Sequence, residues 1–271
     1  MEVHIPDYFD LQKIADSGQC FRVASLPDGT WRFLTGEQVL YIRQTSPGIY
    51  QVSCGPDTWQ QVWVPYFDLS RSYRDLSIPA EDDFLIRAAR AGAGIRILRQ
   101  DPWEMLFTFI ISQRKSIPAI RGVVEQLCRR YGTELHTPAE TLYAFPTASQ
   151  LQSARPEDYL ACKAGYRAPY LCNAVEQVLS GRLDLAGIAA LPDRELIAAL
   201  EGVKGVGIKV ASCVALFAYG RTACAPVDTW IHKIIRQQYQ GQSPFDRYGD
   251  AAGIMQQYFF YYAQNHKAET A

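Results

Sequence analysis

A lysine and an aspartate, Lys209 and Asp228, lie nineteen residues apart in a largely apolar part of the chain. Lys209 follows a short stretch, Val203 to Gly207, that joins two apolar patterns of helical period. The glycines of this stretch, Gly205 and Gly207, permit positive φ and leave backbone N–H groups uncovered. Uncovered N–H groups at a helix N-terminus bind anions, so the stretch predicts a site for an anion such as a phosphodiester.

Lys209 itself is predicted in the first turn of the second helix, where a positive side chain is normally disfavoured. A neutral amine is a nucleophile, and it forms Schiff bases with carbonyl carbons. Few ordinary lysines are neutral at pH 7, but burial and the positive end of the helix both favour the neutral amine. Lys209 is therefore a candidate nucleophile, with a solvated helix lysine as the alternative.

Asp228 follows Pro226 and Val227 and precedes a helical pattern. In this position an aspartate is typical of a helix N-cap. A carboxylate near a helix N-terminus also stays ionised, and it stabilises positive charge that develops in a reaction. The two roles are compatible.

The composition is that of an ordinary globular protein. The chain has 271 residues, 48% of them apolar, and a formal net charge of -1, which argues against a protein that coats DNA non-specifically. No signal peptide and no apolar run near eighteen residues is present, so we expect an intracellular protein without membrane association. The compact length and the lack of a nuclear-type basic run favour a prokaryotic cytoplasm. The seven cysteines are scattered, and nucleotide-binding GxGxxG or GKS motifs are missing. We therefore expect no cofactor, and no disulfide, zinc or iron–sulfur site.

The first part of the chain, to about residue 78, is rich in Trp, Tyr, Val and Ile between short turns. This pattern predicts an antiparallel sheet. The expected strands are Cys20–Val23, Trp31–Thr35, Val39–Arg43 and Tyr50–Cys54.

From about Ala80 the apolar period becomes helical. Asp101, Pro102 and Glu104 form a helix start with an N-cap, a proline at N1 and a glutamate at N3. We expect helices at 102–111, 118–131, 138–145, 147–153, 156–163, 167–180, 193–201, 208–219, 229–238 and 246–264. The predicted fold class is α+β, with an N-terminal antiparallel β domain at 1–79 and a mainly α-helical domain at 80–271. The second domain carries a helix–hairpin–helix motif at about 193–220.

The hairpin, together with the downstream Pro-Val-Asp, resembles the helix–hairpin–helix superfamily of base-excision DNA glycosylases. Four further stretches are similar, in order, to the 8-oxoguanine DNA glycosylase family within it: Ser17–Arg22, Tyr66–Leu69, Gly94–Pro102 and Gly165–Ala168. The resemblance covers nearly the whole chain. It implies a monomeric, bifunctional DNA glycosylase and AP lyase that acts on double-stranded DNA containing an oxidised purine.

The resemblance also implies roles for the two residues above. Lys209 would attack C1′ of the damaged nucleoside, displace the base and form a Schiff base that permits β-elimination of the 3′ phosphate. Asp228 would face the sugar and stabilise the positive charge that develops there.

Four residues match positions that surround the flipped base in the family: Gly18, Cys213, Gln256 and Phe260. The Gly18 carbonyl would accept a hydrogen bond from the N7–H that distinguishes 8-oxoguanine from guanine. Gln256 would bind the Watson–Crick edge, and Phe260 would stack on the base. Without the resemblance, Gln256 and Phe260 indicate an amphipathic C-terminal helix, and Cys213 indicates a small core residue.

Further positions imply contacts with DNA. Tyr166 and Arg167 match residues that wedge the duplex and contact the opposite cytosine, although a surface Tyr-Arg pair is the alternative. The N–H groups of Gly205, Val206 and Gly207 would bind a phosphate. In the family the carbonyls of such a hairpin, here those of Val203 and Val206, can also hold a monovalent cation.

The chain departs from the family after Ser112. Eukaryotic-type members carry an asparagine-rich triplet that fills the gap left by the flipped base, whereas this chain has Gln113, Arg114 and Lys115. Arg114 is long enough to enter that gap and can stack there. Ala119 replaces an arginine that reads the orphan cytosine, so we expect weaker selectivity for the opposite base.

Two other functions remain open at this point. Ser112 and Gln113 resemble the Ser-Gln pair of 3-methyladenine DNA glycosylases, which suggests a monofunctional enzyme that uses Asp228 and water. Such an enzyme has no need of Lys209. A non-catalytic helix–hairpin–helix protein that only binds DNA would need neither residue.

Overall fold

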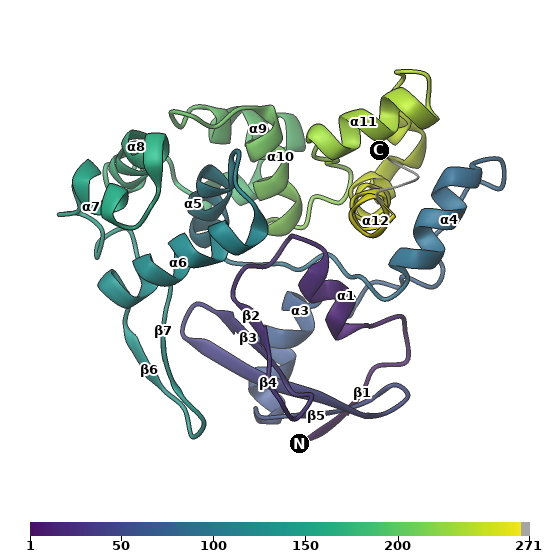
Figure 1. The fold of residues 1–271 in the computed structure, drawn as a ribbon, viewed down its shortest axis with the longest axis horizontal. Helices are drawn as coiled ribbons and strands as arrows, with labels where there is room; N and C mark the ends of the chain where they lie inside the picture. Colours follow the sequence, from purple (N-terminus) through teal and green to yellow (C-terminus); the bar gives the residue numbers. More distant parts are fainter. Residues whose placement is uncertain (267–271) are drawn as a thin grey trace. The chain divides into compact units, whose positions relative to one another are not determined.

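The computed structural model describes residues 1–266 (Figure 1). The chain divides into two compact units, and neither is a single stretch of sequence. The first unit combines Met1–Phe33, Leu40–Arg99 and Gly220–Ala271, and the second combines Leu34–Val39 and Gln100–Tyr219. The predicted domain boundary between residues 79 and 80 stays a prediction, and residues 267–271 of the predicted helical domain lie outside the described part.

The first unit contains the predicted antiparallel sheet, except for the part within Leu34–Val39. Its five strands pair in the order β1-β5-β4-β3-β2. They are β1 Glu2–His4, β2 Val23–Ser25, β3 Trp31–Thr35, β4 Gln38–Ser46 and β5 Ile49–Val52. The strand expected at 20–23 is wrong in position, because Phe21–Arg22 form a bend and pairing with β3 begins at Val23 opposite Phe33.

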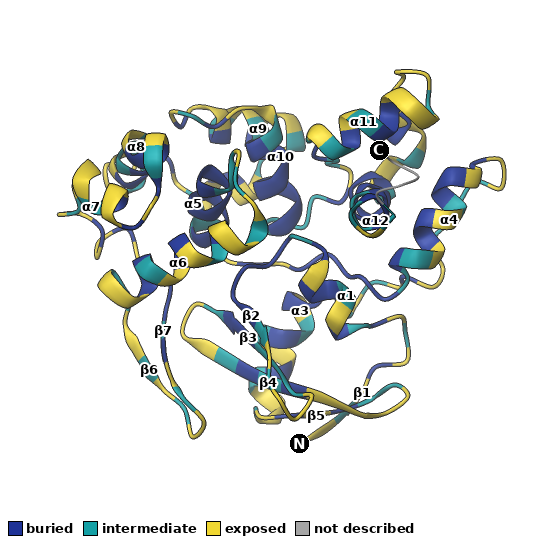
Figure 2. Cartoon of the chain, viewed as in Figure 1, coloured by how far each residue is buried: buried dark blue, intermediate teal, exposed yellow. Residues whose placement is uncertain are grey.

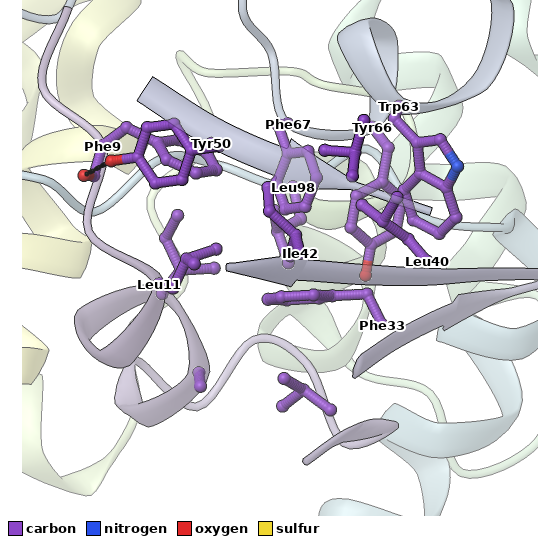
Figure 3. Close-up of a cluster of buried hydrophobic side chains, with 14 of the residues drawn as sticks. Phe9, Leu11, Phe33, Leu40, Ile42, Tyr50, Trp63, Tyr66, Phe67 and Leu98 are labelled. Atoms are coloured by element: carbon purple, nitrogen blue, oxygen red, sulfur yellow. Dashed lines mark hydrogen bonds between the residues drawn. The ribbon is translucent and has the colours of Figure 1, made fainter. Parts of the chain in front are cut away.

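Short helices, which the sequence analysis missed, cover the apolar face of this sheet. They are α1 Leu11–Asp16, α2 Pro56–Thr58, the π-helical turn η1 Trp59–Trp63 and α3 Val64–Tyr66. Phe67 lies at the centre of the cluster they form, with ring centroids 5.1 Å from Phe9, 5.1 Å from Phe33 and 5.0 Å from Tyr66 (Figure 3). All three contacts are edge-to-face, the geometry that aromatic pairs prefer.

A fully buried arginine, Arg96, joins the segments of the first unit. Its guanidinium donates to the carbonyls of Phe67, Tyr8, Asp68 and Arg71 and to the carboxylate of Asp7. These five bonds use all five N–H groups, which compensates for the burial of the charge.

The other helices of the first unit are α4 Asp83–Gly92, α11 Thr229–Gln238, the 3₁₀ helix η4 Phe245–Ala251 and α12 Ala252–Asn265. Helix α12 packs closely along α4: a Cβ added to Gly92 would lie 2.5 Å from the Tyr258 ring. The chain therefore completes its first unit with a C-terminal helix.

The second unit is mainly helical. Its elements are α5 Pro102–Ser112, α6 Ile117–Tyr131, β6 Glu134–His136, β7 Thr141–Tyr143, α7 Pro156–Ala161, the 3₁₀ helix η2 Gly165–Arg167, α8 Ala168–Leu179, the 3₁₀ helix η3 Gly187–Ala190, α9 Asp193–Glu201 and α10 Ile208–Phe217. Helices α5 and α10 form its centre and are dark blue over most of their length in Figure 2. The rings of Phe109 and Phe217 stack between them at 5.6 Å. The α+β fold class is confirmed.

Two helices expected in this unit are wrong. Residues 138–145 instead contain β7, which pairs with β6, because Thr137 turns the chain through hydrogen bonds with Glu140. Residues 147–153 form consecutive turns whose hydrogen bonds mostly span three residues, as in Gln152 to Ser149. Within residues 1–266, no helix has the length and hydropathy needed to cross a membrane.

Candidate active site

The hairpin between α9 and α10 forms at the predicted position. Two buried valines, Val203 and Val206, anchor its six residues to the second unit, and the Val206 N–H donates to the Val203 carbonyl (3.0 Å). Gly207 is the N-cap of α10 and makes no side-chain cap. The backbone N–H groups at the start of α10 are therefore open to an external acceptor.

The two hairpin glycines differ. Gly205 has φ +83°, and a Cβ there would lie 2.3 Å from the Tyr170 ring, so both the backbone and the packing demand glycine. Gly207 has φ -110° and open space around it. Of the two glycines, which both permit positive φ, only Gly205 adopts it, because Gly207 is an N-cap with extended backbone.

Side chains from outside the hairpin hold its backbone in place. The amide Nε2 of Gln113 donates to the Gly205 carbonyl (3.1 Å), and Asn173 Oδ1 accepts from the Lys204 N–H (2.8 Å). Sequence reasoning missed Asn173 and Tyr170 and assigned Gln113 no such role. The bonds span 92 and 31 positions, and no local pattern signals them.

Lys209 lies half-buried in the first turn of α10, with Nζ 5.4 Å from the centroid of the Phe109 ring. No carboxylate among the described residues forms a salt bridge with it. Cys213, one turn further along α10, is buried. The second unit thus presents an amine without a salt-bridge partner, just after a hairpin predicted to bind an anion.

Three predicted DNA contacts belong to the same unit. Arg114 is exposed and has φ +51°. Tyr166 is 52% exposed, whereas Arg167 is buried, with its guanidinium 4.3 Å from the Tyr166 ring centre and Nη1 bonded to the Ala164 carbonyl. Burial lowers the pKa of Arg167. The alternative of a surface Tyr-Arg pair therefore holds only for the tyrosine.

Asp228 belongs to the first unit, where it is the N-cap of α11. Its Oδ1 accepts from the Ile231 N–H (2.9 Å), and its backbone is extended. The predicted N-cap is confirmed. The side chain is only partly buried, so the second carboxylate oxygen has room for another group.

The other candidates of the first unit lie in the α1–β2 loop and on α12. Gly18 has φ +75°, and the next residue, Gln19, fixes this loop through its amide, which bonds to the Arg96 carbonyl and the Leu98 N–H. On α12, Gln256 is buried, and Phe260, one turn later, is partly exposed. This placement suits both a core role and a base pocket.

The predicted residues thus fall into two groups. The second unit holds Lys209, Cys213, the hairpin, Arg114, Tyr166 and Arg167, and the first unit holds Gly18, Asp228, Gln256 and Phe260. A pocket of about 410 Å³ in the first unit is lined by Ala223, Ala225, Val227, Ser243, Phe245, Asp246, Gly249 and Asp250, none of which is a predicted site residue.

The only metal ligands suggested by the family resemblance are backbone carbonyls of the hairpin. The described residues contain no group of three or more His, Cys, Asp or Glu side chains suited to a metal ion. The carbonyls of Val203 and Val206 are hard oxygen ligands, of the type that alkali and alkaline-earth cations accept. A monovalent cation at this hairpin stays a prediction.

Comparison with known proteins covers nearly the whole chain. Residues 2–106 match the N-terminal domain of 8-oxoguanine DNA glycosylase, and residues 107–247 match the HhH-GPD superfamily of base excision DNA repair proteins. A probable N-glycosylase/DNA lyase of Methanothermobacter thermautotrophicus is 28% identical over 227 residues, which are 73% of this chain and 72% of that protein. An N-glycosylase/DNA lyase of Arabidopsis thaliana is 32% identical over 80% of this chain and 63% of its own length.

The fold agrees with a solved structure of this kind. The 8-oxoguanine glycosylase/lyase of Clostridium acetobutylicum, in complex with double-stranded DNA containing cytosine opposite 8-oxoguanine, superposes with a TM-score of 0.91. The two chains are 33% identical, and the match covers 98% of each. On this evidence the chain belongs to the 8-oxoguanine DNA glycosylase family of the HhH-GPD superfamily.

Proposed function

We propose that Lys209 is the nucleophile with which this N-glycosylase/DNA lyase removes 8-oxoguanine from double-stranded DNA. The observation that supports it best is the position of the amine: half-buried, in the first turn of the helix after the hairpin, and without a carboxylate partner among the described residues. A lysine held in this way is suited to nucleophilic attack, because no ion pair occupies its amine and the helix fixes its position after the hairpin.

In the proposed reaction, Nζ of Lys209 bonds to C1′ while the glycosidic bond breaks and its electron pair leaves with the base, which takes up a proton. Opening of the sugar ring then gives a Schiff base between Nζ and C1′. Loss of a proton from C2′ and departure of the 3′ phosphate complete the β-elimination. Asp228 stabilises positive charge on the sugar as the base leaves, with the carboxylate oxygen that does not cap α11.

The damaged base would be read after it is flipped out of the duplex. We assign the N7–H to the Gly18 carbonyl, the Watson–Crick edge to Gln256 and stacking on the base to Phe260, with Cys213 as a further pocket residue. One hydrogen bond to N7–H supplies about 1–3 kcal/mol of discrimination against guanine. The partial exposure of Phe260 supports this assignment, because the side chain is accessible to a stacking base.

The undamaged parts of the duplex would contact the second unit. The N–H groups of Gly205 and Gly207 would bind a phosphate, with the predicted cation as a bridge, whereas the N–H of Val206, predicted to join them, is bonded to the Val203 carbonyl. Arg114 would enter the gap left by the base. Tyr166 would wedge the stack, and Arg167 would have to leave its buried position to reach the opposite base.

We further propose that the protein acts as a monomer in the cytoplasm of a prokaryotic cell, where its substrate lies. Ala119, in place of an arginine, supports weaker selectivity for cytosine opposite the lesion.

Borohydride trapping tests the nucleophile. The substrate is a duplex with one 8-oxoguanine opposite cytosine, and the proteins are the wild type, Lys209→Gln and the control Lys204→Gln, which removes the exposed lysine of the same hairpin. We expect a covalent adduct with the wild type and with Lys204→Gln, and none with Lys209→Gln, which should still bind the duplex. An adduct with Lys209→Gln would refute the proposal, and binding without any adduct would favour the monofunctional or the non-catalytic alternative.

A further inference from the structure

The four residues that follow helix α5, Ser112 to Lys115, form a tight turn with Arg114 near its tip. The Lys115 N–H donates to the Ser112 carbonyl (3.1 Å), Gln113 has φ -55° and ψ 123°, and Arg114 has φ +51°. These values are typical of a type II turn, whose third residue is usually glycine or asparagine. A non-glycine residue at positive φ persists only where its surroundings fix it.

The side chain of Gln113 supplies such a constraint. Its Nε2 donates to the Ile110 carbonyl at the end of α5 (3.2 Å) and to the Gly205 carbonyl in the hairpin (3.1 Å). Among residues 1–266, this is the only hydrogen bond between residues 112–116 and residues 202–207. Gln113 therefore provides the direct hydrogen-bonded link between the turn and the hairpin.

The hairpin around Gly205 is also held by residues other than Gln113. The ring of Tyr170 packs against Gly205, and Asn173 accepts from the neighbouring Lys204 N–H. Removal of the Gln113 amide should thus leave the hairpin in place and release the turn.

Lys115 holds the other side of the turn, with Nζ bonded to the Lys163 carbonyl (2.9 Å). Burial, and then the charge of Arg167, lower the pKa of Lys115. No carboxylate of the described residues forms a salt bridge with Arg114 or Lys115. The turn is thus positively charged and held on two sides, with the side chain of Arg114 exposed.

We infer that Gln113 is a positioning residue, which fixes the turn to the hairpin so that Arg114 stands ready to enter the duplex when the hairpin binds its phosphate. The inference rests on the proposed function, since it assigns Arg114 to the gap left by the flipped base. A Gln113 that only capped the last turn of α5 would stabilise the fold without acting through Arg114.

A double-mutant cycle separates these two roles. Gln113→Met keeps the length of the side chain and removes the donor, and Arg114→Ala removes the gap-filling group. We expect single-turnover excision of 8-oxoguanine to fall about fivefold in Gln113→Met and about tenfold in Arg114→Ala. The double variant should stay near tenfold, because Gln113 has nothing left to position; independent effects would multiply to about fiftyfold.

Two further measurements complete the test. Cleavage of a preformed abasic site should change less than twofold in Gln113→Met, because the hairpin and Lys209 keep their own supports. Gln126→Ala, which removes an amide that bonds to a carbonyl within its own helix, should leave excision unchanged. Multiplicative losses, or equal losses of excision and abasic-site cleavage, would overturn the inference.

The same four proteins are also compared by their affinity for a duplex with a tetrahydrofuran abasic analogue opposite cytosine. This readout does not require excision, so it tests the coupling even if the wild type fails to release 8-oxoguanine. Failure of excision in the wild type would refute the proposed function, whereas additive losses of binding would refute the role of Gln113.

Discussion

Asp228 has a structural role as a helix cap and a proposed chemical role, and two substitutions separate them. Asn and Ser cap helices about as well as Asp but carry no charge. We expect Asp228→Asn and Asp228→Ser to keep the free energy of unfolding within about 0.5 kcal/mol of the wild type. Excision of 8-oxoguanine should nevertheless fall about 100-fold, since the charge that stabilises the sugar cation is lost.

Urea unfolding and single-turnover excision measure the two effects, and Asp228→Ala provides the comparison. The alanine variant should lose about 1 kcal/mol of stability as well as activity, because it also removes the cap from the Ile231 N–H. Near-normal excision by Asp228→Asn would show that the residue acts only as a cap.

At the level of single residues, the sequence predicted those placements that depend on neighbouring residues, such as a helix cap or a turn. Lys209 follows a glycine turn and Asp228 begins a helix, and both placements were found as expected. Gln113 and Asn173 escaped prediction because their partners are distant in sequence. Arg167 was expected at the surface, but its guanidinium folds over its own neighbour, which depends on the turn at residues 164–167 rather than on residue type.

At the level of elements, the two hairpin glycines provide a matched pair. Gly205→Ala should destabilise the second unit by about 1–3 kcal/mol, because it combines a strained φ with a clash against Tyr170. Gly207→Ser should leave stability unchanged or raise it by up to about 1 kcal/mol, since Ser is a good N-cap and the space around it is open.

Both substitutions should weaken binding to duplex DNA, the first by distorting the hairpin and the second by placing a side chain at residue 207, beside the N–H groups that would bind the phosphate. Thermal unfolding and a binding titration separate the two cases. Equal stability of Gly205→Ala and the wild type would contradict the role assigned to Tyr170.

Elements with clear boundaries in the sequence were predicted best. Helices α9 and α11 match their expected residues, and α5 begins after the predicted cap at Asp101. The helices at 56–66 were missed because Trp and Val are equally compatible with a strand, and the packing that decides between them involves residues far away. Strand β7 was mistaken for a helix for the same reason, since its partner β6 determines its conformation.

At the scale of the whole molecule, the Arg96 network predicts how stability depends on pH. Partial burial raises the pKa of Asp7, but hydrogen bonds from the Tyr73 and Tyr8 N–H groups and from Arg96 outweigh it, so the pKa is lowered overall. A carboxyl whose pKa is lower in the folded state stabilises the fold above its unfolded pKa, about 4, and loses this effect as pH falls through the folded value.

We therefore expect Asp7→Asn to lower the free energy of unfolding by about 1–2 kcal/mol at pH 7. The difference from the wild type should shrink progressively below about pH 4. Urea unfolding between pH 7 and pH 3 measures it, with Asp57→Asn, at an exposed position, as the control. A difference that stays constant over this range would exclude ionised Asp7 as its source.

The division of the chain into two units also has a consequence for its synthesis. The ribosome completes Gln100–Tyr219, with Lys209, before it makes the segment from Gly220 onward that carries Asp228 and α12. All residues of the second unit have thus been synthesised while the first unit still lacks its last segment. A chain that stopped before residue 220 would carry the amine without the carboxylate, so both proposed catalytic groups are present only after translation has supplied the end of the first unit.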